Sequence, residues 1–397
     1  MLSDFAKPYI QASVPVLRAH GVAITNRFYK NLFESHPELS NLFNMGNQAQ
    51  GLQQQSLAAA VFAYAANFEQ AEALAPVVTR IAHKHASLGI TPDHYPIVGE
   101  HLLGAIKEVL GEAATPELIQ AWAEAYGVLA NVLIDAEKNL YTTSGQTPGE
   151  LTPMKVVEII PHNKSVNSYR LQPLDSRVIA TFVPGQYMSV AVTLPSGQRQ
   201  LRQYSLSTAP GKNYLQITVK RELGENKPLG MVSNWIHENV KVNDVIHCSA
   251  PFGDFQIDTH ANAPIVMLAA GVGVTPMVSA LNHLVEIHAQ QPIYFQYAVK
   301  KEEDILHKSD IDEARHKLPL LQTNIFIENE STQADVNIGR MHLKGISEAA
   351  LKTGQIYLCG PDGFMKAQWD ALLAAGVQPS QIHREVFGPD LLGHLHN

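Results

Sequence analysis

The 397 residues predict two or three domains, at about 100–200 residues per domain, and a 45% share of hydrophobic residues allows sizeable buried cores. The net charge of −8 argues against a general nucleic-acid-binding protein, which needs a basic excess to neutralise phosphates. Cysteine occurs only at Cys248 and Cys359, which excludes a disulfide framework and a multi-thiolate metal or iron–sulfur site.

The N-terminal segment has no basic flank ahead of an apolar core, so we expect no signal peptide. The longest charge-free run, 263–284, is broken by glycine, proline and polar residues, whereas a membrane span needs about 20 mostly apolar residues. We therefore expect a soluble, cytoplasmic protein without obligatory membrane contact. Nothing in the sequence demands an oligomer, so a monomer is the default expectation.

Residues 1 to about 141 carry helical periodicity and almost no strand alternation. A late helix is predicted to begin with Thr115 as its N-cap and Pro116 at its first position, followed by apolar residues at steps of three or four. The same spacing predicts an earlier helix with the apolar stripe Leu74, Val78, Ile81, His85 and Leu88. We therefore expect the first zone to be all-α.

A turn-rich linker over 142–152 leads into a β-rich zone that ends near Asp258. Leu215, Ile217 and Val219 alternate with polar residues, which predicts a half-buried antiparallel strand. Other short β-rich runs, QYMSVAV and DVIHCSA among them, predict a small antiparallel barrel for this zone.

Beyond residue 258 the pattern changes to near-continuous apolar runs separated by stretches long enough for helices. The runs are PIVMLAA, PIYFQYAV, NIFIE and QIYLCG. Buried strands that alternate with helices predict a parallel sheet covered on both faces, and hence an α/β domain over 259–397.

Glycines mark the junction between the first of these runs and a helix, in the segment GVGVTP at 271–276. At such a junction the backbone and a helix N-terminus can approach a phosphate. The third glycine of the usual dinucleotide fingerprint is absent, so the spacing alone fits a tight strand-to-helix turn equally well. Lys300 and Lys301 end the next strand, where they would meet a ribose 2′-phosphate or form a solvated charge pair.

Five further phrases accompany this segment in order: GQY at 185–187, RQYSL at 202–206, GMVSNW at 230–235, CGPDG at 359–363 and EVFGP at 385–389. Together they resemble the ferredoxin-reductase type of flavin module, an FAD-binding barrel followed by a nicotinamide-dinucleotide domain. The resemblance covers essentially all of 153–397. One departure is the stretch ahead of GMVSNW, which is longer than the family pattern and would be a surface insertion.

The resemblance implies roles for residues in these phrases. Arg202 would pair with an FAD phosphate, Phe387 would stack on the flavin ring, and Glu385 would tune electron transfer. Each of three residues also has a simpler interpretation when it is taken singly. Arg202 would fit a surface charge, Tyr187 an aromatic residue of a strand, and Phe387 a core residue. The implied FAD contacts are Tyr187, Arg202, Gln203, Tyr204, Ser205, Val232, Ser233, Glu385, Val386, Phe387, Gly388 and Pro389. The implied NAD(P)H contacts are Gly271, Val272, Gly273, Val274, Thr275, Pro276, Cys359, Gly360 and Pro361.

The helical zone carries an ordered set of phrases of its own. His85 lies on an apolar stripe, where a lone histidine is more often a core residue than a ligand. Tyr29 in ITNRFYKNLF, Phe43 in LFESHPELSNLFNM and Glu137 at the end of AYGVLANVLIDAE accompany it. With these phrases the chain, from first residue to last, resembles the bacterial flavohaemoglobins, in which a globin is fused to this type of reductase.

On one haem face the resemblance implies that His85 is the proximal ligand of the iron. Tyr95 and Glu137 match a hydrogen-bonded pair at the second ring nitrogen of that histidine. An anionic carboxylate there makes the imidazole a stronger donor to iron, which favours oxygen–oxygen bond cleavage over oxygen storage. Lys84 would reach a haem propionate or remain an exposed lysine.

On the opposite haem face the resemblance places Tyr29 as a hydrogen-bond donor to bound O2 and Gln53 as a second donor. Gln53 and Leu57 are four residues apart, hence on one helix face. Phe43 would be wedged against the porphyrin. A haem pocket is itself a core, so core packing of Phe43 and Leu57 is compatible with this assignment.

The function that the resemblance implies is nitric oxide dioxygenation for detoxification. NAD(P)H would deliver a hydride to FAD, FAD would pass single electrons to a b-type haem, and NO and O2 would become nitrate. A preference for NADH or NADPH is not fixed by the sequence. The implied domains are an all-α globin over 1–141, the linker 142–152, an FAD-binding β-barrel over 153–258 and a Rossmann-like NAD(P)-binding domain over 259–397.

Three other functions stay open at this point. One is reduction of hydroperoxides, or of NO without oxygen, at the same haem. Another is an O2 or NO sensor that has its own reductase, although no output domain follows the globin. The third is a flavin reductase with a helical partner-binding domain and no haem, which predicts that the protein has no Soret absorption.

Overall fold

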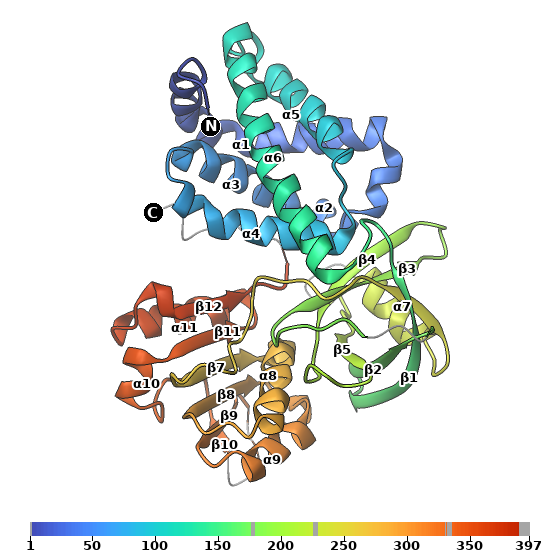
Figure 1. Ribbon diagram of the computed structural model, residues 1–397, viewed down its shortest axis with the longest axis vertical. Coiled ribbons are helices and arrows are strands. Elements are labelled where there is room, and N and C mark those ends of the chain that lie inside the picture. Colours follow the sequence, from blue (N-terminus) through green and yellow to red (C-terminus); the bar gives the residue numbers. More distant parts are fainter. Residues whose placement is uncertain (1, 176–178, 225–228, 330, 332–335, 389–397) are drawn as a thin grey trace. The chain divides into compact units, whose positions relative to one another are not determined.

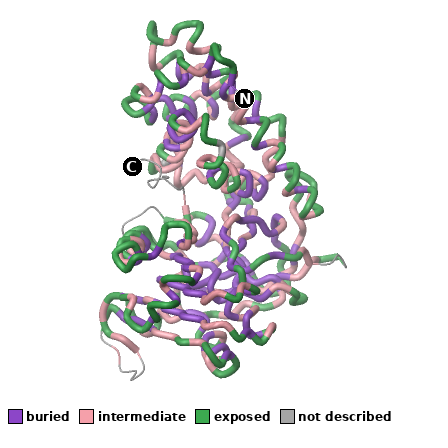
Figure 2. The backbone as a smooth tube through the Cα atoms, turned by 60° about the vertical axis from the view of Figure 1, so that its left-hand side comes forward, coloured by how far each residue is buried: buried purple, intermediate pink, exposed green. Residues whose placement is uncertain are grey.

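The computed structural model describes residues 2–175, 179–224, 229–329, 331 and 336–388 (Figure 1). The chain divides into two compact units, and buried residues gather inside each of them (Figure 2). Unit 1 contains the chain up to Leu151, Ala191–Arg202 and Gly388, and unit 2 contains Thr152–Val190 and Gln203–Phe387. Within the described residues, no helix combines the length and the apolar character needed to cross a bilayer.

Helices make up most of unit 1, as the periodicity predicts. They are α1 Ala6–Ser35, α2 Met45–Ala49, α3 Leu52–Asn67, α4 Ala71–Leu88, α5 His94–Leu110 and α6 Pro116–Ser144, with short 3₁₀ turns at Pro37–Asn41 and Gly111–Ala113. The long helix α1 packs against α3, α5 and α6. Its buried stripe contributes Ile10, Phe28 and Leu32 to the main apolar core of the unit.

The predicted boundaries of α6 hold at its start and shift at its end. Thr115 caps the helix, because its hydroxyl oxygen accepts a hydrogen bond from Leu118 N at 3.2 Å. The helix continues to Ser144, three residues into the segment expected to be linker. It ends there because Gly145 adopts a left-handed conformation, with φ of 65°, which glycine tolerates without strain.

Six antiparallel strands form the first sheet, in the order β4-β3-β6-β1-β2-β5. Their bounds are β1 Thr152–Asn163, β2 Val166–Pro173, β3 Tyr187–Thr193, β4 Arg199–Ser205, β5 Leu215–Lys220 and β6 Val245–Cys248, and helix α7, Met231–Asn239, follows β5. An isolated antiparallel bridge joins Leu206, just after β4, to Ile217 on β5. The two edge strands of the sheet therefore meet, as a small barrel requires.

The expectation that β5 is half-buried is wrong for Gln216 and Thr218, whereas Lys220 at the end of the strand is exposed as expected. Gln216 and Thr218, which should face solvent, are only 5% and 4% exposed. Their polar groups are buried because they hydrogen-bond to other polar side chains: Gln216 Nε2 donates to Ser207 Oγ at 3.2 Å, and Thr218 Oγ1 lies 2.9 Å from His307 Nε2. The alternating polar residues of β5 therefore make buried polar contacts and do not form a face that is exposed to solvent.

The second sheet has the strand order β10-β9-β8-β7-β11-β12, and every strand pair with a described register is parallel. The strands are β7 Ile265–Ala270, β8 Ile293–Val299, β9 Leu321–Ile327, β10 Val336–Ile338, β11 Gln355–Cys359 and β12 Ile382–Glu385. The helices are α8 Thr275–Glu286, α9 Lys308–Lys317, α10 Glu348–Thr353 and α11 Asp362–Ala374, with 3₁₀ turns at Gly271–Val274, Glu302–Asp304 and Pro379–Gln381.

Both faces of this sheet are covered, as predicted from its apolar strands. On β7, Met267 and Ala269 pack into one core cluster together with α8 and α9, whereas Val266 and Leu268 pack into a second cluster with α10 and α11. The alternation follows from the two-residue period of a strand. The structure thus confirms the predicted order of an all-α, an antiparallel and an α/β part.

Candidate functional site

Three helices of unit 1 bring one imidazole, one phenol and one carboxylate together. His85 on α4 has its Nδ1 atom 2.8 Å from Glu137 Oε1 on α6 and 3.2 Å from the hydroxyl of Tyr95 on α5. The Tyr95 hydroxyl donates to the same Glu137 oxygen at 2.5 Å. Glu137 is only 2% exposed, so this carboxylate is buried and held by two donors.

The charge and burial of Glu137 bear on the protonation of its two partners, Tyr95 and His85. Burial and the neighbouring Glu137 carboxylate raise the pKa of Tyr95, so its phenol stays protonated and acts as a donor. A carboxylate accepts hydrogen bonds, so the His85 tautomer that satisfies Glu137 has its hydrogen on Nδ1 and leaves the Nε2 lone pair available. Among the described residues, no side chain or backbone group hydrogen-bonds to that Nε2 atom. An imidazole in this state is suited to bind a metal through Nε2.

A neighbouring side chain positions Tyr95 and was not predicted from the sequence. The Tyr126 hydroxyl donates to the backbone oxygen of Tyr95 at 2.6 Å. The Tyr126 ring lies so close to Gly99 that a Cβ atom there would come within 2.6 Å of it. Gly99 on α5 therefore allows α6 to approach. Lys84, which precedes His85 on α4, is half-buried.

A second polar group of unit 1 lies among aromatic rings. Tyr29 on α1 is 6% exposed, and its ring packs edge-on against Phe43, with centroids 5.6 Å apart. Gln53 and Leu57, both on α3, are half-buried, and Leu57 and Phe43 pack against the same core as Tyr29.

The Tyr29 phenol stays neutral and can donate one hydrogen bond. Burial raises its pKa, and the amides of Gln53 and Gln48 offset this only in part. Gln53 is one of the predicted residues, whereas Gln48 is not. It lies in a stretch rich in glutamine, and nothing in the sequence distinguishes it from the exposed Gln50 and Gln55 nearby.

In unit 2, the two predicted nucleotide segments lie together. They follow β7 and β11, which are neighbouring parallel strands with Ala269 paired to Cys359. A Cβ atom on Gly273 would lie 2.5 Å from the Cys359 backbone oxygen and 2.8 Å from Gly360 N. Only glycine permits this approach. The strand order reverses direction between β7 and β11, which is the switch point where open α/β sheets bind nucleotides.

The predicted FAD residues of the antiparallel sheet lie near the meeting of β3 and β4. Tyr187 begins β3, and Leu206 N donates to Gln186 O at 2.9 Å, which holds the start of β3 beside the end of β4. Four predicted residues end β4 in a row: Arg202, Gln203, Tyr204 and Ser205. The Arg202 guanidinium is half-buried and donates to Leu201 O at 2.7 Å.

The other predicted FAD residues lie on α7 and after β11 and β12. Val232 and Ser233 are buried in the first turn of α7, where the Ser233 hydroxyl donates to Gly230 O at 3.2 Å. Phe387 is 49% exposed, so the core alternative for this ring is wrong. Glu385, Val386 and Gly388 are half-buried. Pro389, and part of the expected surface insertion at 225–228, lie outside the described residues.

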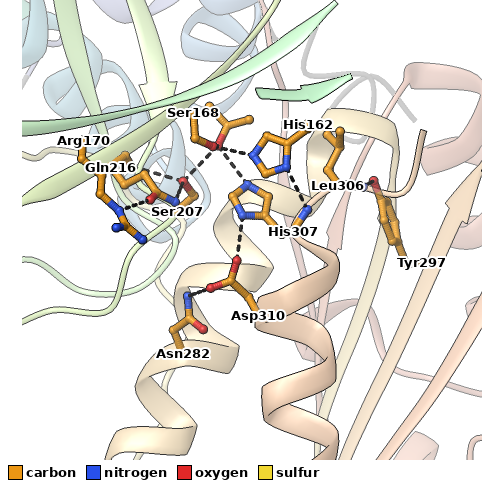
Figure 3. Close-up of polar contacts among 11 residues, drawn as sticks. His162, Ser168, Arg170, Ser207, Gln216, Asn282, Tyr297, Leu306, His307 and Asp310 are labelled. Carbon is orange, nitrogen blue, oxygen red and sulfur yellow. Dashed lines mark hydrogen bonds and ion pairs between the residues drawn. The ribbon is translucent and has the colours of Figure 1, made fainter. Parts of the chain in front are cut away.

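Unit 2 also contains a buried polar cluster that the sequence did not predict. We call it the junction cluster, and it comprises His162, Ser168, Ser207, Thr218, His307 and Asp310. Figure 3 labels all of these residues except Thr218. Thr218 Oγ1 lies 2.8 Å from Ser168 Oγ, 3.0 Å from Ser207 Oγ and 2.9 Å from His307 Nε2. The cluster ties strands of the antiparallel sheet to the N-terminus of α9.

The histidines of the junction cluster differ in their surroundings. His307 Nδ1 lies 3.1 Å from Asp310 Oδ2. Burial alone would raise the pKa of Asp310, but His307 and a hydrogen bond from Asn282 outweigh it and lower that pKa. Burial, together with the charge of a protonated His307, lowers the pKa of His162 to about 4. His162 is therefore neutral at pH 7.

Comparison with known proteins assigns each part of the chain. Family models match in succession: Globin over residues 26–133, the oxidoreductase FAD-binding domain over 153–257 and the oxidoreductase NAD-binding domain over 267–370. A flavohemoprotein of Rhizobium meliloti is 43% identical over 402 aligned residues, covering 98% of this chain and 99% of the relative. One from Bordetella parapertussis is 45% identical over 399 residues, covering 98% and 99%.

Solved structures agree with these matches. The crystal structure of a flavohemoglobin from Malassezia yamatoensis, with bound FAD and heme, has a TM-score of 0.87 at 28% identity and covers 98% of this chain and 100% of its own. The FAD/NAD-binding domain of a nitric oxide dioxygenase from Vibrio cholerae has a TM-score of 0.56 at 33% identity and covers 60% of this chain and 100% of its own.

Proposed function

Because the chain belongs to the flavohaemoprotein family, we propose that it is an NAD(P)H-dependent nitric oxide dioxygenase that converts NO and O2 to nitrate for detoxification. The observation that carries the proposal is the hydrogen-bonded trio of His85, Tyr95 and Glu137. The same chain has a candidate dinucleotide site. The trio makes His85 an electron-rich imidazole, which would serve oxygen chemistry at a bound haem and which simple oxygen storage does not need.

The residues of unit 1 fit a b-type haem. His85 offers an Nε2 atom with no partner among the described residues, and its side chain is 32% exposed. When bound, the haem supplies an iron that binds diatomic gases and accepts single electrons. His85 would hold that iron, while Glu137 accepts a hydrogen bond from Nδ1–H and increases the electron donation of the ring. Lys84, on the same helix, is proposed to reach a haem propionate.

We assign to Tyr29 the role of a hydrogen-bond donor that would act on a haem-bound ligand in an apolar setting. Its phenol keeps its proton, so it can donate a hydrogen bond to a diatomic ligand, and Gln53 adds a second donor. Phe43 and Leu57 exclude water, which strengthens hydrogen bonds by lowering the local dielectric.

FAD and NAD(P)H are assigned to unit 2 and the end of β4. When bound, FAD would accept one hydride from NAD(P)H and pass on its two electrons one at a time. For FAD we propose contacts from Tyr187, Arg202, Gln203, Tyr204, Ser205, Val232, Ser233, Glu385, Val386, Phe387, Gly388 and Pro389. The glycine-rich turn 271–276 and the segment 359–361 would hold the nicotinamide dinucleotide, and their close approach at Gly273 supports this assignment.

The domain limits, cellular site and oligomeric state belong to the same proposal. We assign the globin to 1–141, the linker to 142–152, the FAD domain to 153–258 and the NAD(P) domain to 259–397, and the three matched family models fall inside these ranges. A cytoplasmic location agrees with two cysteines that are both free and buried, and a monomer is the default assignment.

The test is NO consumption measured with an electrode in aerated buffer containing NADH. We expect rapid NADH-dependent loss of NO with nitrate as product, from protein whose spectrum shows haem and flavin. His85→Ala should abolish haem absorption and NO consumption but keep NADH-dependent ferricyanide reduction. His20→Ala, which changes an exposed histidine of α1, should match the wild type.

Each other outcome points to a different function. Loaded wild-type protein that consumes no NO would instead be tested as a hydroperoxide or anaerobic NO reductase, or as a sensor. Wild-type protein that shows flavin but no Soret absorption would contradict the haem assignment and favour a flavin reductase with a helical partner-binding domain.

A further inference from the structure

Gln200 is a fully buried polar side chain to which the proposed function gives no role. It lies on β4, an edge strand of the antiparallel sheet, and its exposed fraction is 0%, although its neighbour Arg199 is exposed. Side chains two residues apart on a strand point to the same face, so Gln200 shares its face with Arg202. Because an unpaired buried amide is costly, the hydrogen-bond partners of Gln200 indicate what it does.

The edge of β4 at Gln200 is covered by the 3₁₀ turn Pro37–Asn41. Both the turn and this part of β4 belong to unit 1. Asn41 Oδ1 accepts a hydrogen bond from Arg199 N at 3.1 Å, and Ser40 O accepts one from Gln200 Nε2 at 3.1 Å. The turn therefore satisfies part of the open edge of the strand and gives the Gln200 amide a fixed anchor.

The partners of the Gln200 amide determine which way it faces. Its Nε2 atom lies 3.1 Å from Ser40 O and 3.1 Å from Arg199 O, and carbonyl oxygens can only accept. Its Oε1 atom lies 3.2 Å from Arg202 Nη1, and a guanidinium can only donate. The opposite orientation would place acceptor against acceptor at one end and donor against donor at the other. Both ends of the amide are thus satisfied in one orientation.

The same amide restrains the Arg202 side chain. Arg202 Nη1 donates to Gln200 Oε1 at 3.2 Å and to Leu201 O at 2.7 Å. Two hydrogen bonds to one terminal nitrogen limit the rotation of the planar guanidinium. Arginine binds phosphate through a rigid fork of N–H groups, so the orientation of the group contributes to binding as well as its charge. A side chain that is held in place beforehand loses less conformational freedom when the phosphate binds.

We infer that Gln200 is a positioning residue for FAD, because it holds the Arg202 guanidinium in the orientation in which Arg202 binds the FAD phosphate. The inference rests on the proposed function, which assigns FAD to Arg202. Gln200 acts through Arg202 Nη1 and is given no contact with the cofactor. Its amide is anchored on Ser40 O, so the 3₁₀ turn supports the arginine through one buried side chain.

The test measures FAD binding by full-length protein from which FAD has been removed. FAD is titrated into wild type, Gln200→Met and Arg202→Ala, and free FAD is determined by absorbance after ultrafiltration. Methionine keeps the approximate size of the side chain but removes the amide that holds Arg202. For Gln200→Met we expect about tenfold weaker FAD binding, equivalent to ~1.4 kcal/mol. Gln200→Leu removes the same amide and should give the same result.

The rate at saturating FAD separates positioning from a general disturbance. Gln200 is assigned no contact with a reacting group, so NADH-dependent ferricyanide reduction by Gln200→Met should reach the wild-type rate once FAD saturates the protein. Only the FAD concentration needed for half of that rate should rise. Weaker binding combined with a lower saturated rate would show that the substitution disturbs the fold, and it would overturn the inference.

Two comparisons show whether the effect passes through Arg202. In an Arg202→Ala background, Gln200→Met should weaken FAD binding no further, because the group that it positions is gone. Gln198→Met is the matched control. Gln198 Nε2 also reaches the turn, at 3.4 Å from Ser40 Oγ, but none of its described hydrogen bonds goes to Arg202. This variant should bind FAD like wild type. A tenfold loss in Gln198→Met, or a further tenfold loss in the Arg202→Ala background, would contradict the inference.

The failure of this inference is distinguishable from that of the proposed function. If the wild-type protein binds no FAD, the flavin assignment fails and the inference fails with it. If Arg202→Ala binds FAD as tightly as wild type, Arg202 is not the phosphate ligand, and the inference is wrong. If Arg202→Ala weakens FAD binding and Gln200→Met does not, the role of Gln200 is refuted while the dioxygenase remains.

Discussion

At the scale of single residues, Glu137 is the group that determines the state of His85. The buried carboxylate accepts from both His85 and Tyr95. Glu137→Gln keeps the shape but removes the charge, so the imidazole should become a weaker donor. We expect the iron–histidine stretch of the ferrous protein to move to lower frequency and NO turnover to fall roughly 10–100-fold. Glu117→Gln, at an exposed position of the same helix, is the matched control, and an unchanged stretch in Glu137→Gln would contradict the role.

Residues differ in how far the sequence could predict them. The family resemblance predicts His85, Tyr95 and Glu137, and the structure brings them within hydrogen-bond distance from three helices. Gln48 was not named, because it lies on a five-residue helix, too short for a periodic pattern to show which face is buried. Tyr126 acts through a backbone oxygen, and such a contact leaves no side-chain pattern to detect.

At the scale of elements, Gly273 is where the two nucleotide segments touch. Gly273→Ala would place a methyl group against the Cys359 backbone, which cannot move aside like a flexible side chain. We expect a raised KM for NADH and at least about tenfold slower flavin reduction in anaerobic stopped flow, since a small misplacement of reacting groups is costly. CO binding to the haem should not change.

Gly363→Ala is the control for this element. Gly363 lies on α11, close in sequence to Cys359, and a Cβ atom there would meet nothing within 4 Å. Alanine is the better helix former by about 1 kcal/mol, so this variant should reduce flavin normally and be no less stable. Equal flavin reduction by both alanine variants would argue against the packing of the two segments as the determinant.

The helices and strands could be predicted where their structure depends on residues close to them in the sequence. The N-cap of α6 and the apolar strands of the parallel sheet depend on neighbouring residues, and both were found as expected. The face of β5 was mispredicted because its partner, His307, is 89 residues away from Thr218. Periodicity reports whether a side chain is polar, and cannot report whether a distant polar group will cover it.

At the scale of the whole molecule, the junction cluster joins the antiparallel sheet to the α/β part inside unit 2. Thr218→Val keeps the volume of the side chain but removes the hydroxyl group that contacts three buried polar partners, namely Ser168, Ser207 and His307. We expect a loss of roughly 1–3 kcal/mol, seen as a reductase thermal midpoint several degrees lower. Thr193→Val, at the exposed end of β3, should stay within about 0.5 kcal/mol of wild type. Equal midpoints for the two variants would show that the cluster contributes no net stability.

The same cluster makes the stability of the reductase depend on pH. The pKa of His162 is lowered from 6.5 to about 4 by burial and by His307, so the unfolded chain binds this proton first as pH falls. Stability is therefore fully present above pH 6.5 and decreases as pH falls from 6.5 toward 4. The pKa values of His283 and His383 are also lowered, so these residues too make stability decrease as pH falls. The lowered pKa of Asp310 affects stability only near and below pH 4.

His162→Gln isolates the contribution of the cluster to this dependence. Glutamine does not titrate, so the drop in the reductase thermal midpoint between pH 7 and pH 5 should be smaller than in wild type. The remaining slope comes from His283 and His383, which the variant leaves in place. His316→Gln removes an exposed histidine of α9 and should keep the wild-type drop. If His162→Gln and wild type lost the same number of degrees, the proton would be taken up elsewhere, and the junction cluster would not be the acid-sensitive contact between the two parts of unit 2.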